Sequence, residues 1–274
     1  MTAIDIVERL IATHGGRAAW DDVISIRASL SSGGLAYASR FQSGKLVRRD
    51  VTVYPGQMRV LMRDFPSAGR WAEWCNDSVR IGRDGQGPHL ARDHARARFR
   101  GWLLHPRWDD LDLAYFVGYA LWNYLSFPRL LELPGVAWQI LRGNRVGDPS
   151  LVSVTFPTSV PTHCSQQYFH LDANGLLRRH DYVAEVFGPW AAGANLCLRS
   201  EVIDGLRLYT RRRVVPSVGR SASVPFPTLV WIDLDQVSVC RSERTPTRPA
   251  QVRGPAIGDP HRPGNALNST KGDP

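Results

Sequence analysis

The spacing of hydrophobic residues indicates one helix followed by a series of strands. Between residues 3 and 14, Val7, Leu10 and Ile11 lie on one face at helical spacing, and Gly15-Gly16 supplies a stop. From residue 24 onward apolar and polar residues alternate, which is the period of a strand with one buried face. The strands predicted in this first block cover residues 24–30, 35–41, 46–54, 57–65, 69–74 and 78–81.

Residues 84–133 interrupt the alternation and are predicted as a helical insertion. The stretch 92–100 carries arginines four residues apart, which indicates a charged, solvated helix or loop. The stretch 109–125 is apolar on nearly all sides and begins with Asp109 and Asp110, where negative charge suits the helix dipole. A helix that is apolar all round must be covered on most sides. A short helix is predicted at 129–133.

Strands resume after Gly135, with short turns such as 172–175 between them. Short connections predict antiparallel pairing, because a parallel pair needs a long crossover. We therefore expect a mainly β domain over residues 1–240, built as a single curved antiparallel sheet or incomplete β-barrel. The N-terminal helix and a helical lid formed by the insertion would lie on its concave side. The predicted strands of this second block are 137–142, 151–156, 164–171, 176–186, 196–203, 206–215 and 228–240.

The composition limits the classes of partner that the chain is expected to bind. The chain has 34 Lys and Arg against 25 Asp and Glu, a net charge of +9, and much of this excess is scattered. Nucleic-acid binding needs a continuous basic face, whereas Arg212 would point away from Arg211 and Arg213 on a strand, so no nucleic-acid partner is predicted. Residues 241–274 are rich in Pro, Gly and Arg and predict a disordered tail. The oligomeric state is left open.

The chain start and the cysteines bear on location. The first residues lack a basic region followed by a long apolar stretch, so no secretory signal is predicted. The longest apolar run, 111–125, is too short for a membrane span, and no stable membrane insertion is expected. The four cysteines show no CxxC spacing, which favours thiols in a reducing compartment. A cytoplasmic location is predicted.

Three passages resemble LolA-like proteins, a superfamily that includes lipoprotein-sorting carriers and mycobacterial lipid carriers. They are the helix end, Gly-Gly, tryptophan and first strand at 14–26, the hairpin at 168–178 and the start of the next hairpin at 204–208. The stretch 109–125 also resembles uncharacterised bacterial proteins of similar length. The resemblance implies an incompletely closed barrel with an apolar concave face and helices that lid its opening.

Candidate catalytic groups lie in the second block of strands. His180 and Tyr182 share one face of strand 176–186 and could exchange a proton, because imidazole titrates near neutral pH. Glu201 is a third candidate, as a carboxylate inside an apolar cup would serve as acid or base. The alternatives are a hydrogen-bonded sheet histidine and a Glu201 that pairs with a neighbouring arginine on a solvated face.

Other chemistry finds little support. There is no HxH, HExxH or CxxC, so no metal is predicted, and there is no Walker loop or GxGxxG after a strand, so no cofactor is predicted. Cys164 is a weak candidate nucleophile, because its neighbour His163 would point to the opposite face of a strand.

Two hypotheses for function follow. In the first, the chain binds a hydrophobic small molecule, lipid or polyketide-like, in an apolar cup. In the alternative it is a cofactor-free cyclase, isomerase or hydrolase that acts on such a molecule by acid–base catalysis. Binding is preferred, because only the enclosure is supported by the pattern. The residues expected to contact the ligand are Tyr115, Phe116, Tyr119 and Trp122.

Overall fold

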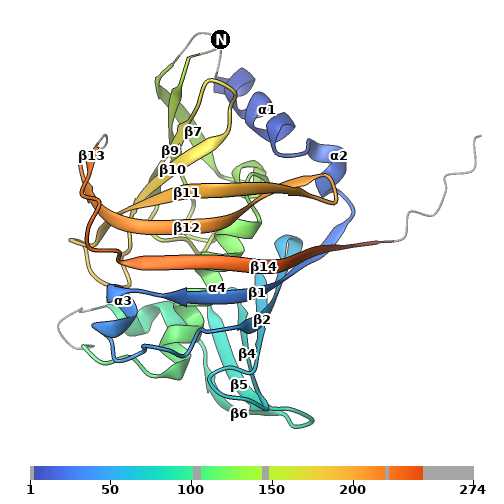
Figure 1. Cartoon of the computed structure of the whole chain (residues 1–274), viewed down its shortest axis with the longest axis vertical. Helices are drawn as coiled ribbons and strands as arrows, with labels where there is room; N and C mark the ends of the chain where they lie inside the picture. The colour runs from blue at the N-terminus through green and yellow to red at the C-terminus, as the bar shows by residue number, and fades with distance from the viewer. Residues whose placement is uncertain (1–2, 101–105, 144–147, 220–221, 243–274) are drawn as a thin grey trace, which may run out of the picture. The chain divides into compact units, whose positions relative to one another are not determined.

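The computed structural model describes residues 3–100, 106–143, 148–219 and 222–242. These described residues form one compact unit. Its described strands form one antiparallel sheet in the order β6-β5-β4-β3-β2-β1-β14-β12-β11-β10-β9-β8-β7, with the short β13 beside β12 (Figure 1). The tail predicted at 241–274 lies outside the described residues from 243 onward. The prediction of a single, mainly β, antiparallel sheet is confirmed.

The first six strands form a meander that we call the first meander. Residues 34–48 lead from its first strand to its second, short connections join the other strands, and every neighbouring pair is antiparallel. The inward-facing side chains of its middle strands are apolar and buried, among them Val53, Val60, Met62 and Trp74. Its strands are β1 (Val23–Gly33), β2 (Arg49–Tyr54), β3 (Arg59–Arg63), β4 (Arg70–Cys75), β5 (Ser78–Arg83) and β6 (Pro88–Arg92).

The remaining strands form the second meander. Its last long strand, β14, pairs antiparallel with β1, with Ile26 opposite Val239, so the two ends of the domain meet in the middle of the sheet. β6 and β7 end the strand order, and the described strands do not close into a barrel. The strands are β7 (Ala137–Arg142), β8 (Ser150–Thr155), β9 (Gln166–Leu171), β10 (Leu177–Val183), β11 (Ala192–Ile203), β12 (Leu206–Val218), β13 (Ala222–Ser223) and β14 (Val230–Arg241).

The N-terminal helix α1 (Ala3–Thr13) is present as predicted, and Val7, Leu10 and Ile11 are buried. The chain then turns at Gly15, which has a φ of 113° and lies so close to the β11–β12 turn that a Cβ would fall 2.5 Å from the Gly205 oxygen. Only glycine tolerates both conditions. The short helix α2 (Arg17–Trp20) follows and buries Trp20.

The long apolar helix α4 (Asp110–Leu125) begins with a capping box between Asp109 and Asp112. All residues from Leu111 to Leu125 are buried, so the expectation that the helix is covered on most sides is confirmed. It contacts β2 to β6 and also β12. A Cβ on Gly118 would lie 2.3 Å from the Cβ of Trp74, which shows how closely helix and sheet approach. The helix thus lies on the inner face of the sheet and is packed into the core.

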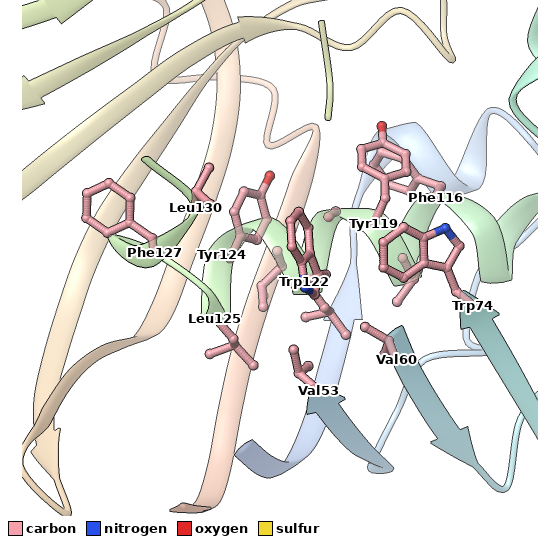
Figure 2. Packing of buried hydrophobic residues seen from close by; sticks show 14 of the residues in the cluster. Val53, Val60, Trp74, Phe116, Tyr119, Trp122, Tyr124, Leu125, Phe127 and Leu130 are labelled. Atoms are coloured by element: carbon pink, nitrogen blue, oxygen red, sulfur yellow. The ribbon is translucent and has the colours of Figure 1, made fainter. Parts of the chain in front are cut away.

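The two sides of α4 face different surroundings. Figure 2 shows Trp122 among Val53, Val60 and Trp74, while Tyr119 and Tyr124 point to the other side of the helix. The Trp122 indole donates a hydrogen bond to the Pro55 oxygen at 3.2 Å. One side of the helix is therefore fixed on the first meander, and the other side is left for the second.

Two predictions of local structure were wrong. Residues 35–41, predicted as a strand, contain the helix α3 (Leu35–Ala38), because Gly34 bends the chain with a φ of 126° beside the backbone of Leu229. The insertion predicted as helical contains the strand β6, whose residues are mostly exposed at the sheet edge and so lack an alternating apolar signal. The arginine-rich stretch forms η2 (Ala95–Phe99), a 3-10 helix. Two further 3-10 helices are η1 (Pro55–Gln57) and η4 (Arg129–Glu132).

No helix in the described part of the chain combines the length and the apolar character needed to span a membrane.

Candidate functional site

The side of α4 that faces the second meander meets buried polar residues. His163 and Gln167 are fully buried, His180 is 4% exposed and Arg212 is 2% exposed. Buried polar groups are unfavourable unless they are hydrogen bonded, so each must be accounted for. His163 belongs to the segment before β9, Gln167 to β9, His180 to β10 and Arg212 to β12.

His163 is the centre of a hydrogen-bonded chain of aromatic side chains. Its Nδ1 lies 3.2 Å from the Tyr119 hydroxyl and its Nε2 2.8 Å from the Tyr124 hydroxyl, and the latter is 2.8 Å from the Tyr182 hydroxyl. The His163 ring also stacks on the Tyr182 ring with centroids 3.7 Å apart. The helix is thereby joined to β10 by the two hydroxyls and to the segment before β9 by the imidazole.

Burial keeps this chain uncharged. It lowers the pKa of His163 well below 6.5 and raises the pKa of Tyr182 well above 10. It raises the pKa of Tyr124 to about 12. In a neutral imidazole one ring nitrogen donates and the other accepts, so His163 accepts a hydrogen bond from one of the two hydroxyls and donates one to the other.

His180 lies beside this chain. Its ring centroid is 5.0 Å from that of Tyr182 and 4.2 Å from that of Phe169, on which it stacks. Its Nε2 lies 2.6 Å from the Gln167 Oε1, and because an amide oxygen can only accept, the imidazole donates this hydrogen bond. The Gln167 Nε2 donates to the Cys164 oxygen. Burial lowers the pKa of His180 well below 6.5, and the charge of Arg212 acts in the same direction.

The structure brings two of the three predicted catalytic candidates together. His180 and Tyr182 face inward from the same strand, as predicted, with their rings in contact. Glu201 lies elsewhere: Asn195 of β11 is opposite His180, and Glu201 is further along that strand, opposite Leu208. It accepts a hydrogen bond from the Thr210 hydroxyl at 2.8 Å and pairs with Arg199.

A cavity of about 720 Å³ lies next to the buried network. It lies between η2, the start of α4 and the segment 156–165 that leads into β9. Apolar side chains form part of its wall, including Phe99, Tyr115, Phe156 and Val160, and polar or charged side chains form the rest. The polar and charged members are Asn76, Asp77, Arg96, Arg100, Thr158, Ser159, Thr162, Ser165 and Glu185.

Arg96 connects the cavity wall with the network. Its guanidinium donates to the Thr162 oxygen at 2.7 Å, to the His163 oxygen at 3.1 Å and to Glu185 at 2.7 Å. It also lies 5.6 Å from the centroid of the Tyr119 ring. This arginine therefore fixes the segment that carries His163. Sequence reasoning assigned it to a solvated face, and the regular arginine spacing gave no sign that one member is turned inward.

Of the four residues predicted to contact a ligand, Tyr115 lines the large cavity. Tyr119 lies behind the wall, under Arg96, with its hydroxyl on His163. Phe116 packs against Trp108 and Phe187. Trp122 faces the first meander on the other side of the helix, as Figure 2 shows.

The side chains at the cavity favour recognition over nucleophilic attack. Cys164 lines the cavity while His163 points inward, which is the opposite orientation expected for neighbours on an extended chain. Burial raises the pKa of the Cys164 thiol to about 11, so it is protonated at neutral pH, whereas the thiolate is the nucleophile. Within the described residues, no group of three or more His, Cys, Asp or Glu is arranged to hold a metal ion.

No family model and no curated protein sequence matches the chain. Among solved structures, a LolA superfamily protein from Nitrosomonas europaea is similar at 13% identity, over 88% of this chain and 95% of that one, with a TM-score of 0.48. A DUF1329 family protein from Desulfovibrio piger is similar at 14% identity, over 86% of this chain and 90% of that one, with a TM-score of 0.45. The first is of the superfamily that the sequence motifs resemble. At these sequence identities and TM-scores, neither similarity assigns a function to this chain.

Proposed function

We propose that this chain binds a small molecule with a hydrophobic body in the cavity between η2, the start of α4 and the segment 156–165. The observation that carries the proposal is the size of the cavity together with its mixed wall. Its volume of about 720 Å³ falls among the cavities of about 300–1,000 Å³ that take small molecules.

The apolar part of the wall supplies the favourable energy of binding. Phe99 and Tyr115 stack with ring centroids 5.5 Å apart and form a rigid aromatic surface, to which Phe156 and Val160 add. Rigid rings lose little conformational entropy when a ligand covers them. Each Å² of apolar surface removed from water contributes roughly 25 cal/mol.

The polar part of the wall supplies orientation. Arg96 is held by two backbone oxygens and Glu185, so its position is fixed before a ligand arrives. Hydroxyls of Thr158, Ser159 and Ser165 are available on the neighbouring segment. Polar groups held in fixed positions are what orient a ligand and give a site its specificity.

The test is to fill the cavity from an exposed position. Ser159 is exposed and lines the cavity, so Ser159→Trp adds a large ring there without disturbing a buried residue. The matched control is Ser43→Trp, at an exposed residue away from the cavity. Binding of the neutral fluorescent probe N-phenyl-1-naphthylamine is measured for all three proteins.

Wild type and Ser43→Trp should bind the probe equally, and Ser159→Trp should bind it at least about tenfold more weakly, a difference of 1.4 kcal/mol. Melting temperatures of the three proteins confirm that each is folded. Equal affinity in Ser159→Trp, or no binding by wild type, would overturn the proposal.

A further inference from the structure

The exposed apolar side chains of the domain are concentrated in three segments. Twelve large apolar side chains are exposed among the described residues, and seven of them, including all three aromatic ones, lie in residues 34–48, 187–191 and 216–229. Single exposed apolar residues are normal on a protein surface, whereas a group of them marks an interaction site. The seven are Leu35, Phe41, Val47, Trp190, Val218, Val224 and Phe226, with exposed fractions from 45% to 78%.

Backbone hydrogen bonds bring the three segments to the same end of the sheet. The Leu35 amide donates to the Thr228 oxygen at 3.2 Å, which joins the first segment to the third. Gly193 pairs with Pro216, so the segment just before β11 lies at the end of β12 that carries the β12–β13 hairpin. Figure 1 shows α3 and β13 at the same end of β1, β12 and β14. We call the surface formed by the three segments the exposed apolar end.

The exposed apolar end carries positive charge and no carboxylate. Its three segments contain no Asp and no Glu. Their described basic residues are Arg40, Lys45 and Arg48, of which Lys45 pairs with Asp110. Among the ion pairs of the described residues, none joins Arg40 or Arg48 to a carboxylate. Part of the positive charge at this end is therefore not balanced within the described part of the chain.

Arginines and aromatic rings lie next to one another at this end. The guanidinium of Arg107, an exposed residue just before α4, lies 5.3 Å from the centroid of the Phe41 ring. Arg107 also takes part in none of the ion pairs of the described residues. The half-buried Arg40 lies 5.4 Å from the centroid of the Phe187 ring. Apolar rings and cationic groups thus reach the surface together.

This combination of side chains indicates the chemistry of the partner. Aromatic side chains are favoured where the headgroups of a membrane meet its hydrocarbon, and long arginine side chains reach the headgroups from there. Anionic headgroups attract basic residues near the membrane surface. A second copy of the chain that used the same surface would bring the same positive charge into the contact, with no carboxylate in the three segments to balance it.

We propose that the exposed apolar end docks on a membrane surface that contains anionic lipids. The rings of Phe41, Trp190 and Phe226 enter the boundary between headgroups and hydrocarbon, and the neighbouring arginines contact lipid phosphates. The contact is peripheral and reversible. None of these residues lines the large cavity, so the proposal does not rest on the function proposed for that cavity.

The first test is co-sedimentation with vesicles. Vesicles of phosphatidylcholine alone are compared with vesicles in which about a third of the lipid is phosphatidylserine. Wild type should bind the anionic vesicles at least about tenfold more tightly. Raising sodium chloride from about 0.1 M to about 0.5 M should weaken this binding several-fold, because salt screens the attraction. Equal binding to both kinds of vesicle, or no binding to either, would overturn the proposal.

The second test locates the surface with matched variants. Phe41→Asn removes a ring and suits the φ of 60° at this residue, and it should bind anionic vesicles about fivefold more weakly. Its control is Val202→Asn, at a 60% exposed residue near the opposite end of β11, where binding should not change. Arg107→Gln should also bind about fivefold more weakly. Its control is Arg27→Gln, at an exposed residue in the middle of β1.

Melting temperatures show whether each variant is folded. Wild-type binding by both Phe41→Asn and Arg107→Gln would overturn the proposal, as would equal losses in the variants and their controls.

Light scattering after size-exclusion chromatography distinguishes a membrane from a second copy of the chain. Without lipid, wild type and Phe226→Ser should have the same mass, because the ring of Phe226 has no protein partner to lose. A wild-type dimer that Phe226→Ser converts to a monomer would overturn the proposal and assign the surface to a contact between two copies.

Discussion

The two meanders of the sheet bury different kinds of side chain against the same helix. Against the first meander, α4 presents Gly118 and Trp122 to side chains such as Val60 and Trp74. Against the second, it presents Tyr119 and Tyr124 to histidine, tyrosine and arginine side chains. The first interface is held by close packing, which depends on shape. The second is held by hydrogen bonds, which depend on every partner being in place.

The difference separates stability from function in this fold. The first meander forms a close-packed apolar support. Polar groups that are unfavourable to bury gather in the second meander, behind the wall of the large cavity. Buried polar groups with strongly shifted pKa values are often functional. The proposed binding cavity lies beside this polar half, and the first meander holds α4 in place.

The largest expected effect comes from pH, which should act on the polar half. Burial lowers the pKa of His14 to about 4, and those of His163 and His180 well below 6.5. The unfolded chain then binds more protons than the folded one below pH 6.5, so the stability these groups retain above pH 6.5 is lost as pH falls toward their folded pKa values. Each histidine should contribute about 1.4 kcal/mol per pH unit inside this window.

Urea unfolding at pH 7.5 and at pH 5.5 measures this loss. His14→Gln removes one of the three histidines and should reduce the loss between the two pH values by about 1.4 kcal/mol, which lowers the slope by roughly a third. An unchanged slope in His14→Gln would show that acid sensitivity arises elsewhere.

The next largest effect is expected in the apolar interface between α4 and the first meander. Trp122 is 1% exposed and packs near Trp74 with ring centroids 6.1 Å apart, so Trp122→Ala should reduce the free energy of unfolding by about 3–5 kcal/mol. The probe affinity of the folded variant should not change, since Trp122 does not line the large cavity. The control is Trp190→Ala, at a ring that is 62% exposed, with an expected change of about 0.5 kcal/mol or less.

This comparison has a clear failing outcome. A Trp122→Ala protein that stays stable and loses probe binding would place the ligand against the first meander and reverse the roles of the two halves.

A smaller effect is expected where the two halves meet at the cavity. Arg96→Met removes the hydrogen bonds to the Thr162 and His163 oxygens and should cost about 1–3 kcal/mol, because these buried acceptors lose a charged donor. Arg98→Met is the matched control on the same 3-10 helix, where the side chain is 40% exposed and the expected change is about 0.5 kcal/mol or less. Chemical denaturation of both variants makes the comparison, and equal losses would show that Arg96 has no special role.

The regular parts of the fold could be predicted from the sequence because their signals are local. The alternation in β10 and the Asp172–Gly175 turn before it are complete within a few residues. The apolar residues on nearly all sides of α4 likewise predicted that this helix is buried. The strand β6 was not predicted, because its side chains are mostly exposed and no apolar face marks it. The helix α3 was not predicted, because four residues are too few to distinguish a helical period from an alternating one.

The site could be predicted only in part, for a different reason. His180 and Tyr182 lie two residues apart on one strand, so their common face follows from the alternation. The link from Tyr119 and Tyr124 to His163 joins an insertion to a loop far along the chain, and no local pattern reports such a contact. The inward turn of Arg96 also depends on the position of Thr162, which only the folded chain supplies.

Photo-crosslinking with a diazirine-bearing fatty acid tests the binding proposal most directly, because it reports where an apolar ligand lies. Adducts are mapped by peptide mass spectrometry in wild type and in Ser159→Trp. The account predicts that wild-type adducts concentrate in residues 95–100 and 156–165 and that Ser159→Trp loses them. Adducts concentrated instead at exposed apolar residues such as Trp190 and Phe226, and equal in both proteins, would contradict it.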